Sequence, residues 1–175
     1  MLRTPIRTAV LAALLSSALP AAAAEPARAA GPMAAPGLRD RLVGTWRVVA
    51  IEDRRDRDDP GSAWIQPYGP NPRGYIVYDP TGHVSVHIMR TPAPARFADP
   101  DRPSPAELAA IHEGYAGYFG TYRVDEARGT VTHHVEGGSL PDYIGTDQVR
   151  PVSVSGDRLT IGDGRTWRRV LERVE

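Results

Sequence analysis

Histidine and tyrosine are the residues of this sequence best suited to chemistry near neutral pH. His87, His133 and Tyr122 could form a general acid–base set, because imidazole titrates near neutrality and a phenol can donate a proton. No nucleophile motif or pair of carboxylates accompanies them. We therefore assign no catalytic residue and favour the simpler interpretation, in which buried histidines and tyrosines hydrogen-bond one another and line a pocket.

Metal binding by histidine is the second chemistry to consider. His83 and His87 share one strand face but lie about 13 Å apart at the usual rise of a strand, too far to ligate one ion together. His133 or His134 could join His87 at a metal only through a strand pairing that the sequence does not define. We therefore expect neither a metal nor a cofactor.

Composition excludes further chemistries. All 21 basic residues are arginine and the chain has no cysteine, so Schiff-base lysines, thiol nucleophiles, zinc–cysteine sites and disulfides are absent. The 21 acidic residues bring the formal net charge to zero, which argues against a nucleic-acid partner. Asp56, Asp58 and Asp59 lack the ligand spacing of a calcium loop, so we expect them at a solvated hairpin tip.

A repeating pattern of strand and turn must position these residues. From Gly44 onward, short apolar runs alternate with turn residues, which is typical of an antiparallel meander. The predicted strands are residues 45–51, 64–68, 73–78, 83–90, 120–125, 130–136, 148–154, 159–162 and 166–174. Closing such a sheet leaves no exposed edge, so we predict an all-β fold, an antiparallel up-and-down barrel of about eight to ten strands.

One segment departs from the strand pattern and predicts a helix. Ser104 and Glu107 form a capping box, with proline at the first helical position. One face of the predicted helix carries apolar residues spaced by three and four positions: Leu108, Ile111, Tyr115 and Tyr118. We expect a helix over residues 105–119 that packs on or over the barrel, preceded by a long loop over residues 91–103.

The register of the later hairpin can be derived from its turn. Pairing Asp125 with Thr130 places Tyr122 opposite His133. The inward face then carries Tyr122, Val124, Val131, His133 and Val135, and the outward face carries Thr121, Arg123, Thr132, His134 and Glu136. Only one of the two adjacent histidines can therefore face the interior.

The earlier hairpin is more ambiguous. Pairing Tyr78 with His83 gives one face with Ile76, Tyr78, His83, Ser85, His87 and Met89, and another with Tyr75, Val77, Val84, Val86 and Ile88. Hydrophobicity alone favours the valine face as the inner one. Ligand-binding barrels often have mixed polar interiors, so we favour the face of Tyr78, His87 and Met89, and the alternative stays open.

Several blocks of the sequence resemble a known family. The segment 42–47 looks like the Gly-x-Trp motif of lipocalin and wider calycin barrels, and the blocks 74–82, 118–125 and 130–136 look like the bacterial and fungal lipocalin-like domain family. The resemblance runs from about residue 38 to 174 and implies a small-molecule-sized cavity but no particular reaction. It also implies that Trp46 plugs the barrel floor beneath an arginine from near the last strand, here Arg168 or Arg169.

The first 24 residues have the features of a secretory signal peptide. Arg3 and Arg7 precede an apolar segment, residues 8–19, that is shorter than a membrane span. We expect cleavage after Ala24, with Ala29 as a second candidate and an uncleaved anchor helix as the alternative. Residues 25–37 are predicted to be a flexible leader, and residues 38–175 the barrel domain. Arginine-only basic usage with abundant alanine is typical of a GC-rich bacterial gene, so the periplasm or the exterior is the expected location.

Three function classes fit these observations. The leading hypothesis is an exported barrel, monomeric or homodimeric, that binds a small, largely apolar or amphipathic ligand and has no membrane span after signal removal. Its expected ligand contacts are Tyr78, His87, Met89, Tyr122, His133 and Tyr118. The alternative is an isomerase, cyclase or hydro-lyase that uses the same histidines and tyrosines, although we expect a protein without enzymatic activity. The third class is an envelope interaction module with a solidly packed barrel.

Overall fold

The structure, a computed structural model, describes residues 35–174. The predicted signal peptide, residues 1–24, and leader residues 25–34 lie outside the described residues. Within the described part no helix is long and apolar enough to cross a membrane.

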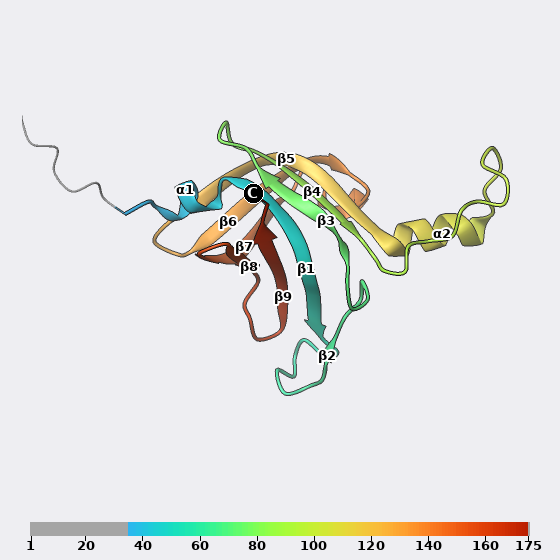
Figure 1. The fold of residues 1–175 in the computed structure, drawn as a ribbon, viewed down its shortest axis with the longest axis horizontal. Helices are drawn as coiled ribbons and strands as arrows, with labels where there is room; N and C mark the ends of the chain where they lie inside the picture. The colour runs from blue at the N-terminus through green and yellow to red at the C-terminus, as the bar shows by residue number, and fades with distance from the viewer. Residues whose placement is uncertain (1–34, 175) are drawn as a thin grey trace, which may run out of the picture. The chain divides into compact units, whose positions relative to one another are not determined.

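The fold is a closed antiparallel β-barrel, as predicted (Figure 1). Its elements are α1 (Leu38–Leu42), β1 (Gly44–Arg54), β2 (Trp64–Ile65), β3 (Arg73–Tyr78), β4 (His83–Met89), α2 (Pro105–Gly114), β5 (Tyr115–Asp125), β6 (Thr130–Gly138), the 3-10 turn η1 (Pro141–Tyr143), β7 (Asp147–Ser155), β8 (Arg158–Ile161) and β9 (Trp167–Arg173). Neighbouring strands pair in the order β2-β1-β3-β4-β5-β6-β7-β8-β9, and the pairing of β1 with β9 closes the barrel.

The later hairpin, β5–β6, has the predicted register. Asp125 pairs with Thr130 and Tyr122 with His133. The inward residues Tyr122, Val131, His133 and Val135 are buried, whereas His134 is exposed. The prediction that His133 faces the interior and His134 faces solvent is therefore confirmed.

The earlier hairpin, β3–β4, is shifted by one residue from the predicted register. The Asp79 N–H donates to the carbonyl of His83 at 2.9 Å, so Asp79 and not Tyr78 lies opposite His83. Tyr78 consequently pairs with Val84, and Tyr75 with His87. A shift of one position moves every side chain of a strand to the other face.

The interior of this hairpin therefore combines residues from both predicted faces. Its inward side chains are Ile76, Tyr78, Val84, Val86 and Ile88. The expectation that His87 and Met89 face the interior is wrong, because both lie on the exposed outer face.

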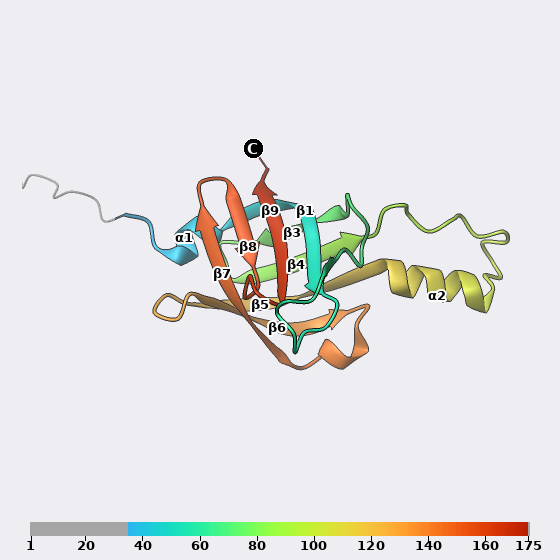
Figure 2. The same ribbon diagram turned by 90° about the horizontal axis from the view of Figure 1, so that it is seen from below.

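Helix α2 begins where the capping box predicts but ends at Gly114 rather than at residue 119. Ser104 Oγ accepts from the Glu107 N–H, and Glu107 Oε2 accepts from the Ser104 N–H. The chain from Tyr115 onward instead pairs with β4, with Met89 opposite Tyr115. Leu108 and Ile111 are exposed, so the apolar face of the helix does not pack on the barrel, and α2 extends away from it (Figure 2).

A bulge in β1 determines which of its side chains face inward. The pairing of β1 with β9 is irregular between Val48 and Ala50, so the alternation of faces shifts at Val49. Trp46 and Val48 face inward before the bulge, and Ile51 and Asp53 after it. The bulge thereby buries Asp53 in place of Glu52.

One end of the barrel is closed by α1 and the residues beneath it. Leu38 and Leu42 are buried, and the Glu126 carboxylate accepts from the Leu38 and Arg39 N–H groups at the start of the helix. Trp46 is completely buried, and its indole N–H donates to the Leu42 carbonyl at 2.8 Å. The prediction that Trp46 forms the barrel floor fits this position.

The arginine on Trp46 is Arg173 rather than Arg168 or Arg169. Its guanidinium carbon lies 4.1 Å from the centre of the indole ring, and it also donates to the Val43 carbonyl. Since β1 and β9 run antiparallel, the start of β1 meets the end of β9, and Trp46 pairs with Arg173. Arg168 and Arg169 lie at the start of β9, opposite Glu52 and Ile51, at the other end of the barrel.

Candidate functional site

A cavity of about 350 Å³ occupies the half of the barrel opposite α1. Its wall contains the apolar residues Ile76, Val86, Ile88, Ala116, Leu140 and Ile161. Its polar and aromatic lining comprises Arg57, Tyr68, Tyr118, His133, Tyr143, Gln148, Arg150, Trp167 and Arg169. The half nearer α1 is filled by core side chains, among them Trp46, Tyr78, Tyr122 and Leu171. The volume is within the usual range for small-molecule sites and argues against a solidly packed barrel.

His133 lies at the boundary between the cavity and the packed core. Its Nε2 is 2.9 Å from the Tyr78 hydroxyl, and its Nδ1 is 2.8 Å from the Tyr118 hydroxyl. Burial, with a further contribution from the charge of Arg150, lowers the pKa of His133 to about 3. The imidazole is therefore neutral at physiological pH and carries one N–H, so one tyrosine accepts from it and the other donates to it.

The tyrosines beside His133 are held as neutral phenols. Burial raises the pKa of the Tyr78 hydroxyl well above its ordinary value, and burial also raises that of Tyr118, with Arg150 acting in the opposite direction. The rings of Tyr78 and Tyr122 pack edge to face at 5.1 Å. Both nitrogens of His133 are therefore occupied, and among residues 35–174 no Asp or Glu lines the cavity.

Three arginines bring positive charge to the cavity wall, and two of them share one carboxylate. Asp53 Oδ1 accepts from Arg57 at 3.2 Å and from Arg169 at 3.1 Å. Arg150 is half-buried and forms no ion pair with any carboxylate among residues 35–174. Its guanidinium carbon lies 5.9 Å from the ring centres of both Tyr143 and Trp167.

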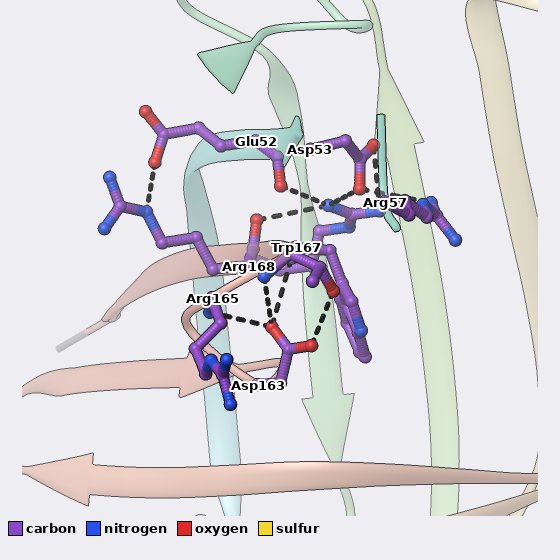
Figure 3. Close-up of polar contacts among 9 residues, drawn as sticks. Glu52, Asp53, Arg57, Asp163, Arg165, Trp167 and Arg168 are labelled. Atoms are coloured by element: carbon purple, nitrogen blue, oxygen red, sulfur yellow. Dashed lines mark hydrogen bonds and ion pairs between the residues drawn. The ribbon is translucent and has the colours of Figure 1, made fainter. Parts of the chain in front are cut away.

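A tight turn positions Trp167 at the edge of the cavity. Asp163 accepts from backbone N–H groups of the segment that leads into β9 (Figure 3). The distances to the Arg165 and Trp167 nitrogens are 2.8 and 3.1 Å. Although burial acts to raise it, the pKa of the Asp163 carboxyl is lowered by these bonds and by those from Thr166. The same view shows Asp53 beside Arg57 and the Glu52 carboxylate beside Arg168.

The six residues predicted from the sequence to contact a ligand do not all lie at the cavity. His133 and Tyr118 line the cavity, and Tyr78 lies behind them in direct contact with His133. Tyr122 lies in the packed half, where its hydroxyl donates to the Asp79 carbonyl. His87 and Met89 are on the outer face and outside the cavity lining.

On that outer face His87 belongs to a short polar chain. Its Nε2 is 2.9 Å from the Ser85 hydroxyl and its Nδ1 is 2.7 Å from the Tyr115 hydroxyl. The acid–base set suggested for His87, His133 and Tyr122 is therefore not assembled, because His87 is on the opposite side of the sheet from His133. Residues 35–174 contain no cluster of three or more His, Cys, Asp or Glu suited to holding a metal ion.

Arg150 is the main cavity residue that the sequence analysis missed. Along β7 the buried residues Val152 and Val154 set the inward positions, and the same alternation places Arg150 and Gln148 inside. Val149, which hydrophobicity alone would turn inward, is 61% exposed. Extending the alternation from the two buried valines would have identified Arg150.

Comparisons with known proteins give a family match and a similar solved structure. A family model described as a lipocalin-like domain matches residues 43–172. A solved structure of a lipocalin-like protein from Bacteroides uniformis ATCC 8492 is similar with a TM-score of 0.43 and 11% sequence identity, covering 77% of this chain and 99% of that chain. A comparison with curated proteins gives no significant match.

Proposed function

Because the chain belongs to the lipocalin-like domain family, we propose that it is an exported barrel that binds a small, largely apolar molecule in its interior. The observation that supports this proposal best is the cavity of about 350 Å³ above His133. Its aliphatic wall supplies apolar contact, and its few hydroxyl, amide and guanidinium groups can orient a bound molecule, which is the usual composition of a small-molecule site.

The sequence supports the exported location in this proposal. A positive start, a short apolar segment and small residues at positions 22–24 are the features of a cleaved signal peptide. A ligand-binding barrel in the periplasm or outside the cell would carry or sequester a molecule that dissolves poorly in water.

The most direct test is native mass spectrometry of the protein purified from its own host. We expect a discrete mass increment that is lost on denaturation and corresponds to a molecule small enough for the cavity. A preparation that remains unliganded after exposure to a host lipid extract would contradict the proposal.

Filling the cavity provides a matched test. Ala116 lines the cavity from β5, so Ala116→Trp should occupy the space and abolish binding of N-phenylnaphthylamine, a neutral apolar dye that fluoresces when bound. Val149→Trp, on the exposed outer face of β7, is the control and should bind the dye like the wild type. Equal binding by all three proteins would place the dye outside the cavity and contradict the proposal.

A further inference from the structure

The charge around the cavity is unbalanced. Arg57, Arg150 and Arg169 line it, and none of the lining residues within 35–174 is acidic. Asp53, just behind the wall, is shared by Arg57 and Arg169 and neutralises one positive charge. The cavity therefore presents excess positive charge in a barrel half that is otherwise apolar.

Arg150 contributes the part of this charge that no carboxylate among residues 35–174 balances. The residue directly opposite it is Val131, on the inner face of β6. Its guanidinium carbon lies 5.9 Å from the ring centres of Tyr143 and Trp167, and no carboxylate among residues 35–174 is within ion-pair distance. Contact with these rings offsets part of the cost of desolvating the guanidinium, and an accompanying anion would offset the rest.

The groups around Arg150 are arranged to receive such an anion. The Tyr118 hydroxyl is held at His133 Nδ1, on the cavity side of the imidazole. Tyr143 is on the same side, with its ring 6.1 Å from that of Tyr118. A planar guanidinium beside hydroxyl groups provides hydrogen-bond donors suited to the two oxygens of a carboxylate.

We infer that the ligand is an amphipathic monocarboxylate whose carboxylate binds Arg150 and whose apolar chain lies against Ile88, Ala116 and Ile161. This inference rests on the proposed function, because it assigns the chemical class of the molecule in the same cavity. One guanidinium without an ion-pair partner among residues 35–174 favours a ligand with one acidic group, and the aliphatic wall favours an apolar chain.

The test is a series of probes with one chain and three head groups. Decanoate, decanol and decylamine are compared for displacement of N-phenylnaphthylamine from the wild-type protein at pH 7.5. We expect decanoate to bind about tenfold more tightly than decanol, because charge-assisted hydrogen bonds are roughly twice as strong as neutral ones, and decylamine to bind most weakly. This comparison uses the intact protein and does not depend on any variant folding.

Substitutions then locate the head group. Arg150→Gln should reduce decanoate affinity to the level of decanol while leaving decanol affinity unchanged, and Arg150→Lys should retain part of the preference. The control is Arg123→Gln, which removes an arginine from the exposed face of β5 and should preserve the preference.

Each outcome decides one of the two hypotheses. If decanoate and decanol displace the dye equally, or neither does, the carboxylate inference is wrong and the cavity still binds the apolar dye. If Arg123→Gln lowers the decanoate preference as much as Arg150→Gln, the effect is one of overall charge and the inference is also wrong. Failure of the proposed function is distinguishable, since Ala116→Trp would then bind the dye like the wild type.

Discussion

At the scale of single residues, His133 links the stability of the barrel to pH. Its pKa is about 3 in the folded protein and near 6.5 in an unfolded chain, so acidification protonates the unfolded chain first. The stability that comes from keeping this imidazole neutral is complete above pH 6.5 and is lost as the pH falls from 6.5 towards 3.

We therefore predict that His133→Gln flattens the pH dependence of unfolding. Between pH 6.5 and 4, titration of His133 should lower the free energy of unfolding of the wild type by about 1 kcal/mol per pH unit, in addition to the shared contribution of the carboxylates. Urea unfolding at several pH values gives the slopes, which can be compared even if the variant is less stable at pH 7. His134→Gln, on the exposed face, should keep most of the wild-type slope; equal slopes in His133→Gln and the wild type would contradict the prediction.

Trp46 and Arg173 form a second pair whose contribution can be measured. Trp46→Ala removes a completely buried indole and should lower the free energy of unfolding by roughly 3–5 kcal/mol. Arg173→Gln should lower it by a smaller amount, about 1–3 kcal/mol, through loss of the ring contact and the bond to the Val43 carbonyl. Chemical denaturation of both variants is the measurement, with Arg128→Gln on the exposed β5–β6 turn as control. An unchanged midpoint for Trp46→Ala would show that this residue does not support the floor.

The sequence predicted single residues well only where a local pattern determined them. Tyr118 and His133 were placed in the site, but Arg150 was missed because the neighbouring Val149 competes for the inward position. Arg168 and Arg169 were assigned to Trp46 because the family resemblance implies an arginine from near the last strand. The antiparallel closure of the first strand against the last brings Arg173 to Trp46 instead, a long-range relation that local spacing does not reveal.

At the scale of elements, the turn residues predicted the hairpins correctly. The errors in register, in strand faces and in helix length came from backbone features that have no clear pattern in the sequence. The β3–β4 register depends on one residue, Asp79. Its N–H donates to the His83 carbonyl, so Asp79 lies opposite His83 and the register differs by one residue from the predicted one. The bulge at Val49 likewise turns the Asp53 side chain inward in place of Glu52, and no glycine or proline at this position indicates a bulge. The extent of α2 was overestimated because Tyr115 and Tyr118 fit both helical spacing and strand pairing with β4.

Helix α2 should be stabilised locally and independently of the barrel. Its capping box is intact, while Leu108 and Ile111 are exposed. We predict that Ser104→Ala destabilises the helix by about 1 kcal/mol, increasing hydrogen exchange of its amides while the amides of β5 and β6 keep their protection. Ser155→Ala, at an exposed strand end, is the control. Loss of protection throughout the barrel would show that α2 packs on it.

At the scale of the whole molecule, the closed barrel was predicted correctly because nine strand segments occur in sequential order and a closed sheet satisfies all their edges. The cavity was expected from the family resemblance, whereas its position in one half of the barrel depends on which interior side chains are large. Trp46, Tyr78 and Tyr122 fill one half, and this distribution follows from the register of all strands together.

Export is the prediction that concerns the entire chain. When the full sequence is expressed in a bacterium with a periplasm, the mature protein should begin at Glu25, or near Ala30 if the second site is used. Fractionation followed by N-terminal sequencing measures this. The same chain beginning at residue 25 should remain in the cytoplasm, and recovery of an intact Met1 on membrane-bound protein would contradict cleavage.

The packed half of the barrel beneath α1 bears on how quickly a molecule in the cavity could leave. The half of the barrel beneath α1 is filled by Trp46 and the side chains around it, so a molecule bound as proposed would enter and leave at the opposite end of the barrel. Its residence time would then depend on two segments that line the cavity, the connection after β1 that carries Arg57 and the turn η1 that carries Tyr143. Substitutions that stiffen either segment would then prolong retention while the aliphatic wall formed by the strands stays the same.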